Sequence, residues 1–203
     1  MSIQKQSSES SVETITAYII GALRDGYVDE RQYLVSIGQK NKEWLEFLRA
    51  LVKKTFDIDS NIRQFQNAFE LRIFSKEFFN YLKSRGVRDG STTPESIMAT
   101  KKLWVPYISG FFDAEGHCTS PETFKKTKKK KVSFHQNDKK SLEFIKSVLE
   151  ENKIKTSEIY LQKGRNCHVL YIQSKDGILK FGSIFCPIRK RKQLDALLSV
   201  LPP

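Results

Sequence analysis

The chain has 203 residues, 39% of them hydrophobic and 29% charged, so it can bury one large core or two small ones. Its 35 lysines and arginines outnumber 23 acidic residues, and the resulting net charge of +12 favours a polyanionic partner such as nucleic acid. No run approaches about 18 apolar residues, which argues against a membrane span. Three dispersed cysteines without CxxC spacing argue against a zinc site.

The elements of the first half follow from periodicity. Residues 1–13 are polar, and we expect a flexible tail without a signal peptide. A helix over residues 18–24 ends in Asp25 and a glycine. Residues 27–39 alternate as in a strand, a helix follows from Asn41, and two more strands precede a helix capped by Ser75.

The same order of elements recurs in the second half. The segment QKNKEWLEFL, residues 39–48, aligns with QNDKKSLEFI, residues 136–145, and both contain the letters LEF. Downstream, LRIFSK aligns with LYIQSK. A repeat of roughly 90–100 residues indicates duplicated domains, because solenoid repeats run about 20–50 residues. We therefore expect half-domains at residues 14–88 and 104–203, joined by a linker over residues 89–103.

The segment YISGFFDAEGH, residues 107–117, carries the chemistry-bearing motif. Ile108, Phe111 and Phe112 share one helix face, and Glu115 stands at the carboxyl end before Gly116. A carboxylate is unfavourable at that end of a helix, because the helix dipole is already negative there. The position therefore favours a bound cation.

Two helices that end in an acid and a glycine, each opening one half of a duplicated chain, resemble the LAGLIDADG homing endonucleases. The resemblance is to the monomeric, archaeal-like form with two fused half-domains. It implies an α+β fold of two pseudo-symmetric αββαββα half-domains. Each would carry an antiparallel β-saddle over DNA, and the motif helices would pair at a central interface.

The resemblance also implies that Asp25 and Glu115, with backbone near Arg24 and Ala114, bind Mg²⁺, for which Mn²⁺ can substitute. Mg²⁺ suits oxygen ligands that leave room for water and phosphate. One departure concerns spacing: Glu115 follows Gly110 by five residues, whereas Asp25 follows Gly21 by four. Either Gly21 packs one position out of register, or the first motif is degenerate.

The resemblance further implies polar residues that order solvent and a basic residue that polarises water near the expected site. Gln39 and Gln136 stand at matched strand-to-helix junctions and would order solvent; surface glutamines are the alternative. Lys190 and Lys192 would polarise water, unless they form a solvated basic helix start. The DNA-binding candidates are outward strand residues and phosphate-contacting lysines. They are Gln32, Ser36, Lys40, Arg63, Glu70, Arg72, Lys128, Lys130, Lys163, Arg165, Asn166 and Tyr171.

These observations predict an intracellular, monomeric, Mg²⁺-dependent endodeoxyribonuclease that cuts a long, near-asymmetric double-stranded site, with no membrane partner. The expected location is cytoplasm or nucleoid, or an organelle in a eukaryote. Two alternatives stay open on the same fold. One is an intron RNA maturase, and the other is a DNA-binding protein that has lost cleavage.

Overall fold

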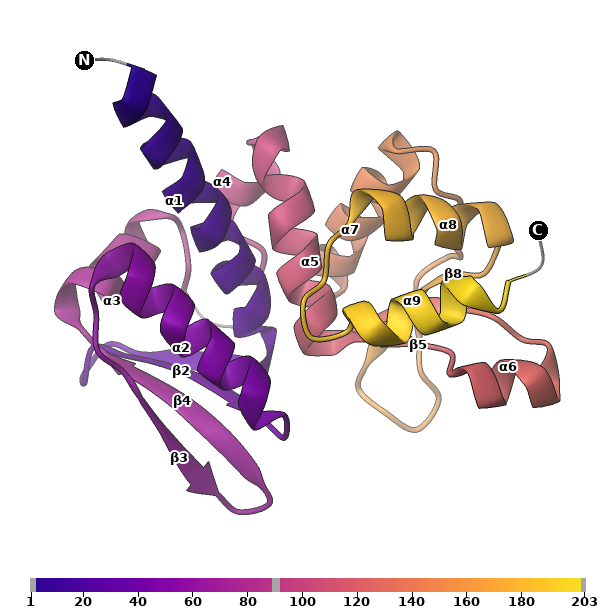
Figure 1. Ribbon diagram of the computed structural model, residues 1–203, viewed down its shortest axis with the longest axis horizontal. Coiled ribbons are helices and arrows are strands. Elements are labelled where there is room, and N and C mark those ends of the chain that lie inside the picture. The colour runs from indigo at the N-terminus through magenta and orange to yellow at the C-terminus, as the bar shows by residue number, and fades with distance from the viewer. Residues whose placement is uncertain (1–2, 89–91, 202–203) are drawn as a thin grey trace. The chain divides into compact units, whose positions relative to one another are not determined.

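The computed structural model describes residues 3–88 and 92–201, except for the side chains of residues 3–10 and of Asp25. It consists of two compact units, Met1–Ala114 and Glu115–Pro203. Each unit contains one four-stranded antiparallel sheet (Figure 1), ordered β1-β2-β4-β3 in the first and β5-β6-β8-β7 in the second. The predicted α+β class with two such sheets is confirmed.

The first unit contains the seven elements of the predicted half-domain, a 3₁₀ turn directly after the first helix, and three elements that follow the last helix. In chain order they are α1 (Ile3–Ala22), η1 (Leu23–Asp25), β1 (Gly26–Asp29), β2 (Leu34–Gln39), α2 (Lys42–Phe56), β3 (Asn61–Phe65), β4 (Ala68–Phe74), α3 (Lys76–Ser84), α4 (Glu95–Met98), η2 (Lys101–Leu103) and α5 (Trp104–Glu115). One expectation differs from this order, because helix α1 extends into the segment expected as a tail. The paired strands β1 and β2 are the two strands that the αββαββα order predicts after the first helix. Residues 89–91 of the predicted linker lie outside the described residues.

The second unit repeats the order from β1 to α3, two strands, a helix, two strands and a helix, and adds two helices. Its elements are β5 (Gly116–Cys118), α6 (Pro121–Thr127), β6 (Val132–Gln136), α7 (Lys139–Glu151), β7 (Tyr160–Leu161), β8 (His168–Ile172), α8 (Lys175–Ile184) and α9 (Arg191–Ser199). The lysine-rich segment, residues 125–131, lies between β5 and β6 and begins within helix α6. Ser120 caps helix α6 by accepting from Thr123 N, and Pro121 suits the first helical position, so the segment begins as a helix.

Side chains that alternate along the first sheet separate a core face from an open face. Val35 and Ile37 of β2 pair with Ile73 and Leu71 of β4, and all four are buried. Helices α2 and α3 cover this face (Figure 1). The sequence spacing predicts an apolar stripe on α2 at Trp44, Leu45, Leu48, Leu51 and Val52, and all of these are buried except Leu51, which is half-buried. The residues between the core positions therefore form the open face.

Helices α1 and α5 pack against each other within the first unit, through two glycines. A Cβ atom on Gly21 would lie 2.1 Å from the Tyr107 carbonyl oxygen, and one on Gly110 would lie 2.1 Å from the Tyr18 carbonyl oxygen. The two contacts are reciprocal, and each glycine follows its tyrosine by three residues. The pairing of motif helices therefore depends on backbone approach that no larger residue allows.

A buried polar chain adds specificity to this packing. The Tyr18 hydroxyl donates to Asp113 Oδ2 at 2.6 Å and accepts from Trp44 Nε1 at 3.0 Å. It links α1, α2 and α5 and leaves the wholly buried Asp113 with a hydrogen-bond donor.

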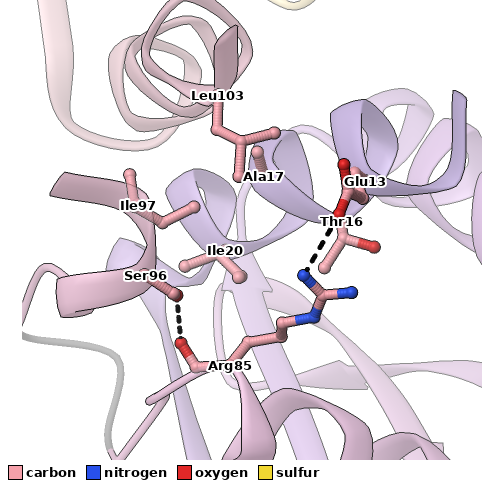
Figure 2. Close-up of a pocket in the computed structure, with 8 residues that line it drawn as sticks. All are labelled: Glu13, Thr16, Ala17, Ile20, Arg85, Ser96, Ile97 and Leu103. Atoms are coloured by element: carbon pink, nitrogen blue, oxygen red, sulfur yellow. Dashed lines mark hydrogen bonds and ion pairs between the residues drawn. The ribbon is translucent and has the colours of Figure 1, made fainter. Parts of the chain in front are cut away.

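Ion pairs hold the segment after α3 against α1 (Figure 2). Arg85 Nη1 lies 3.4 Å from Glu13 Oε1, and Ser96 donates to the Arg85 carbonyl. Lys102 Nζ lies 2.7 Å from the second Glu13 oxygen. The cavity among these residues measures about 10 Å³, room for about one water, so it is a packing gap and not a ligand site.

Candidate active site

Glu115 ends helix α5 and stands directly before the first strand of the second sheet. Its side chain is half-buried. The next residue, Gly116, pairs with Phe134 in β6, which fixes where the helix end meets the sheet. The carboxylate is therefore held at the junction of helix and sheet, as its sequence position predicts.

Lys190 reaches this junction from the segment before α9. It is 7% exposed, and its ammonium donates a hydrogen bond to the Gly116 carbonyl oxygen. A buried lysine is rare without a compensating partner, so its placement beside the helix end supplies a fixed positive charge. Lys192, the other predicted basic candidate, is exposed on α9.

The two predicted glutamines make the same local contact in both units. Gln39 Oε1 accepts from Lys40 N at 2.9 Å, and Gln136 Oε1 accepts from Asn137 N at 2.7 Å. Each is the last residue of the second strand of its sheet. Because the amide oxygen is occupied in this way, the amide nitrogen is the end that presents donors elsewhere.

Both Glu115 and the Gln136 backbone act on the Cys167 thiol. The pKa of the Cys167 thiol is raised mainly by burial, and the negative charge of Glu115 raises it further. A hydrogen bond from the Gln136 backbone works in the opposite direction. Glu115, Gln136 and Cys167 therefore lie in one neighbourhood of the second unit.

The first motif ends differently, in the 3₁₀ turn η1. Gly26 pairs with Ile37 just as Gly116 pairs with Phe134, so Asp25 and Glu115 both immediately precede the equivalent strand residue. Five α-helical residues from Gly110 to Glu115 rise about 7.5 Å at about 1.5 Å each. From Gly21 to Asp25, one α-helical and three 3₁₀ residues, at about 2.0 Å each, also rise about 7.5 Å.

The 3₁₀ turn therefore compensates in length for the missing residue. Gly21 packs in register with Gly110, and the deletion is absorbed between Gly21 and Gly26. Rotation is not fully compensated, because three 3₁₀ residues turn about 360° and the four corresponding α-helical residues about 400°. The side chain of Asp25 itself lies outside the described residues.

Arg24, next to that acid, is a packing residue. It is 7% exposed, its Nη2 donates to the Thr92 carbonyl at 2.6 Å, and its guanidinium lies 5.9 Å and 5.7 Å from the ring centroids of Tyr107 and Phe111. It therefore connects the end of the first motif to helix α5 within the first unit.

The described donor at Glu115 is a carboxylate, which suits a metal that takes oxygen ligands and keeps several waters. Among the described residues, which exclude the side chains of residues 3–10 and of Asp25, no group of three or more His, Cys, Asp or Glu side chains could hold a metal ion. Mg²⁺ is commonly bound by one or two carboxylates together with substrate phosphates and water, and not by an all-protein cage. A single half-buried carboxylate beside backbone carbonyls fits that mode.

The open face of the first sheet is organised by a carboxylate. Glu70 is 7% exposed; its Oε1 accepts from Ser36 Oγ at 2.6 Å, and its Oε2 lies 2.6 Å from Arg63 Nε and 4.0 Å from Arg72 Nε. Burial works to raise the pKa of Glu70, but the hydrogen bonds and the two arginine charges outweigh it, so the pKa is lowered. The carboxylate is ionised and holds both guanidiniums.

The equivalent face of the second sheet carries imidazoles and lysine. His117 pairs with Ser133, whose hydroxyl lies 3.0 Å from His135 Nε2. Burial, followed by nearby positive charges, lowers the pKa of both histidines; Lys131 and Lys190 act on each. Lys131 Nζ also lies 4.6 Å from the centroid of the Tyr171 ring.

Comparison with known proteins identifies the family. The sequence profile of the LAGLIDADG-like domain matches residues 13–85 and again 105–185, together more than half of the chain. The chain belongs to the LAGLIDADG family. A search of curated proteins finds no significant sequence match.

Solved structures show the same fold at low identity. Mesophilic variants of the homing endonuclease I-DmoI match with a TM-score of 0.70 and 20% identity, covering 91% of this chain and 98% of that one. I-DmoI in complex with DNA and Mn matches at 0.64 and 21%, covering 87% and 99%. Full-length DUF199/WhiA from Thermatoga maritima matches at 0.66 and 18%, covering 95% and 63%.

The remaining candidates for DNA binding on this LAGLIDADG fold are mostly exposed. Gln32 lies in the turn between β1 and β2, where it bonds to Asp29, and Lys40 directly follows β2. A surface cavity of about 520 Å³ is lined by residues 128–131, Tyr171 and Gln173. The exposed candidates in the second unit are Lys128, Lys163, Arg165 and Asn166, and Lys130 is half-buried. Their contacts with DNA stay a prediction.

Sequence reasoning missed several residues that the LAGLIDADG fold brings together. His117 and His135 were far apart in sequence and had no ligand spacing, but strand pairing places them on one sheet face. Phe65 and Phe74 are 53% and 47% exposed on the open face of the first sheet. One signal could have found the two phenylalanines: each follows an arginine by two residues.

Among the described residues, no helix is long and apolar enough to span a bilayer.

Proposed function

We propose that this chain is a monomeric, site-specific endonuclease that cuts double-stranded DNA with Mg²⁺ at the two motif ends. The observation that carries the proposal is the placement of Glu115 at the end of α5, with Lys190 and Gln136 positioned around the same junction. The net charge of +12 and the arginine-bearing sheet supply affinity for the polyanion.

The chain's own residues have distinct roles in this reaction. Glu115 and Asp25 would hold the metal ions, which supply Lewis acidity to the scissile phosphate and a more acidic water. Lys190 fixes the Gly116 carbonyl and adds positive charge beside an anionic phosphate. The amide groups of Gln39 and Gln136 orient solvent, because each is anchored by its oxygen.

Replacement of the motif acid tests the proposal. Full-length protein with Mg²⁺ should cut a site selected from a randomised duplex library. Glu115→Gln should lower the cutting rate at least about a thousandfold, since it removes several kcal/mol of metal-dependent stabilisation, and should leave binding within a few-fold. Glu143→Gln, an exposed glutamate on α7, is the matched control and should cut normally.

The rival functions give different outcomes. Sequence-specific binding without cutting by the unaltered protein would favour a DNA-binding protein that has lost cleavage. The likeness to WhiA, similar in degree to that with I-DmoI, shows that the fold alone does not decide between them. Tighter binding of the parent intron RNA than of any duplex DNA, with rescue of its splicing, would favour a maturase.

A further inference from the structure

The open face of the first sheet carries two copies of one short arrangement. Arg63 and Phe65 lie two positions apart on β3, and Arg72 and Phe74 lie two positions apart on β4, so each pair shares a face. The guanidinium carbon lies 5.4 Å from the ring centroid in the first pair and 4.6 Å in the second. Both phenylalanines are exposed, and they do not serve the core.

Glu70 lies between the two pairs and fixes both arginines. It faces Arg63 directly across the β3–β4 ladder and binds its Nε, the inner end of the guanidinium. Arg72 Nε lies 4.0 Å from the same oxygen and is a buried donor without a hydrogen-bond partner. Each guanidinium therefore has a ring on one side and the Glu70 carboxylate behind it; the carboxylate is hydrogen-bonded to Arg63 and attracts Arg72 by charge alone.

We propose that each Arg-x-Phe pair reads a guanine and a neighbouring thymine in the major groove of the target duplex, with Glu70 as the residue that positions both arginines. The terminal nitrogens of an oriented guanidinium match guanine O6 and N7, and an apolar ring matches the thymine methyl. Because the phenylalanine ring packs beside the guanidinium, the thymine whose methyl it contacts is in the base pair next to that guanine. This inference rests on the proposed DNA-binding function.

The spacing of the two rings favours a duplex over unpaired bases. Phe65 pairs with Ala68 at one end of β4, whereas Phe74 pairs with Leu34 at the other end. Successive unpaired bases stack on neighbouring rings, and these rings are separated by most of the strand. Two separate reading positions along a groove fit this arrangement better than one stacking platform.

Binding selection from a randomised duplex library, without divalent metal, tests the assignment. The unaltered full-length protein should select two guanines, each beside a thymine. Arg63→Ala should lose preference for one of these guanines by about 5- to 150-fold, and Arg72→Ala for the other. Phe65→Ala should lose the thymine beside the guanine read by Arg63. Because the ring also orients Arg63, this variant should weaken the preference for that guanine too, but less than Arg63→Ala does. Replacement of that thymine by deoxyuridine should weaken the unaltered protein about 4-fold and this variant not at all.

Glu70→Gln separates positioning from folding. It should reduce discrimination at both guanines while its binding to non-specific duplex stays unchanged, which a general folding defect would not do. Lys54→Ala, exposed on α2 over the opposite face, is the control and should select the original sequence.

Two results would overturn the inference while the proposed function stands: selected sites without guanine–thymine steps, or arginine and phenylalanine variants that select an unaltered sequence. Absence of any sequence-specific duplex binding by the unaltered protein would overturn both together.

Discussion

The two motif ends show how one architecture accommodates unequal sequences. Helix α5 stays α-helical as far as Glu115, whereas α1 ends at Ala22 and continues to Asp25 as a 3₁₀ turn. Both then enter a strand with equivalent pairing. The glycine contacts and the strand register are preserved, and the helix between them changes pitch. What the fold holds constant is therefore the distance between two packing points and not the number of residues between them.

The open faces of the two sheets differ more than the motif ends do. The first carries an ionised carboxylate and two arginines that it positions, and the second carries two histidines of lowered pKa near lysines. Positioned arginines suit base recognition, whereas lysines act on phosphates as point charges. The two halves are therefore expected to divide specificity and affinity unequally.

Substitution of the two glycines tests most directly whether α1 and α5 pack in an equivalent way. Gly21→Ala and Gly110→Ala should each destabilise the protein by about 3 kcal/mol, because a Cβ would overlap a backbone oxygen that cannot move. Urea unfolding measures this. Asn80→Ala, exposed on α3, should stay within about 0.5 kcal/mol. A large effect at only one glycine would contradict the reciprocal packing.

The lysine at the second motif end should matter more than its exposed neighbour. Lys190→Met leaves the Gly116 carbonyl without its donor and should cost about 1–3 kcal/mol in urea unfolding. Lys192→Met, exposed on α9, should change stability by less than about 0.5 kcal/mol. Equal effects of the two substitutions would show that the buried contact does not stabilise the motif end.

The two sheets should lose stability in different pH ranges. The lowered pKa values of His117 and His135 mean that the folded state takes up protons less readily than the unfolded chain, so their contribution to stability falls as the pH drops below about 6.5. The lowered pKa of Glu70 gives a contribution that is complete above about pH 4.5 and is lost as the pH falls through its folded value.

Thermal unfolding against pH separates these ranges. His135→Gln should remove up to about one proton of uptake between pH 7 and 5.5, and Glu70→Gln should flatten the curve only below about pH 4.5. If both variants change the same range, the division between the sheets is wrong.

The smallest expected effect concerns the lysine segment. Lys128→Ala and Lys130→Ala should each reduce the slope of log affinity against log salt by about 0.9 and leave the selected DNA sequence unchanged. Binding to one duplex at several salt concentrations measures this. A changed sequence preference would assign base contacts to these lysines.

The sequence predicts most of the fold, because its signals are local or repeated. The α2 stripe, the caps at Asn41 and Ser75 and the duplicated LEF segment all correspond to observed elements. The 3₁₀ turn was not predictable, because only packing at Gly21 and pairing at Gly26 together show where a residue is missing. The sheet faces likewise depend on register between distant strands, which places Glu70 opposite Arg63 and His117 opposite Ser133.

The change of pitch before Asp25 also bears on how such chains are found. A search pattern with a fixed spacing between glycine and acid accepts Gly110 and Glu115 but rejects Gly21 and Asp25. Such a search would find the second motif of a duplicated protein and miss the first. A pattern that allows four or five residues and requires a strand-forming segment after the acid-glycine pair would recover both copies. A single deletion at this point changes the last turn from α-helical to 3₁₀, but the helix still ends at the equivalent position.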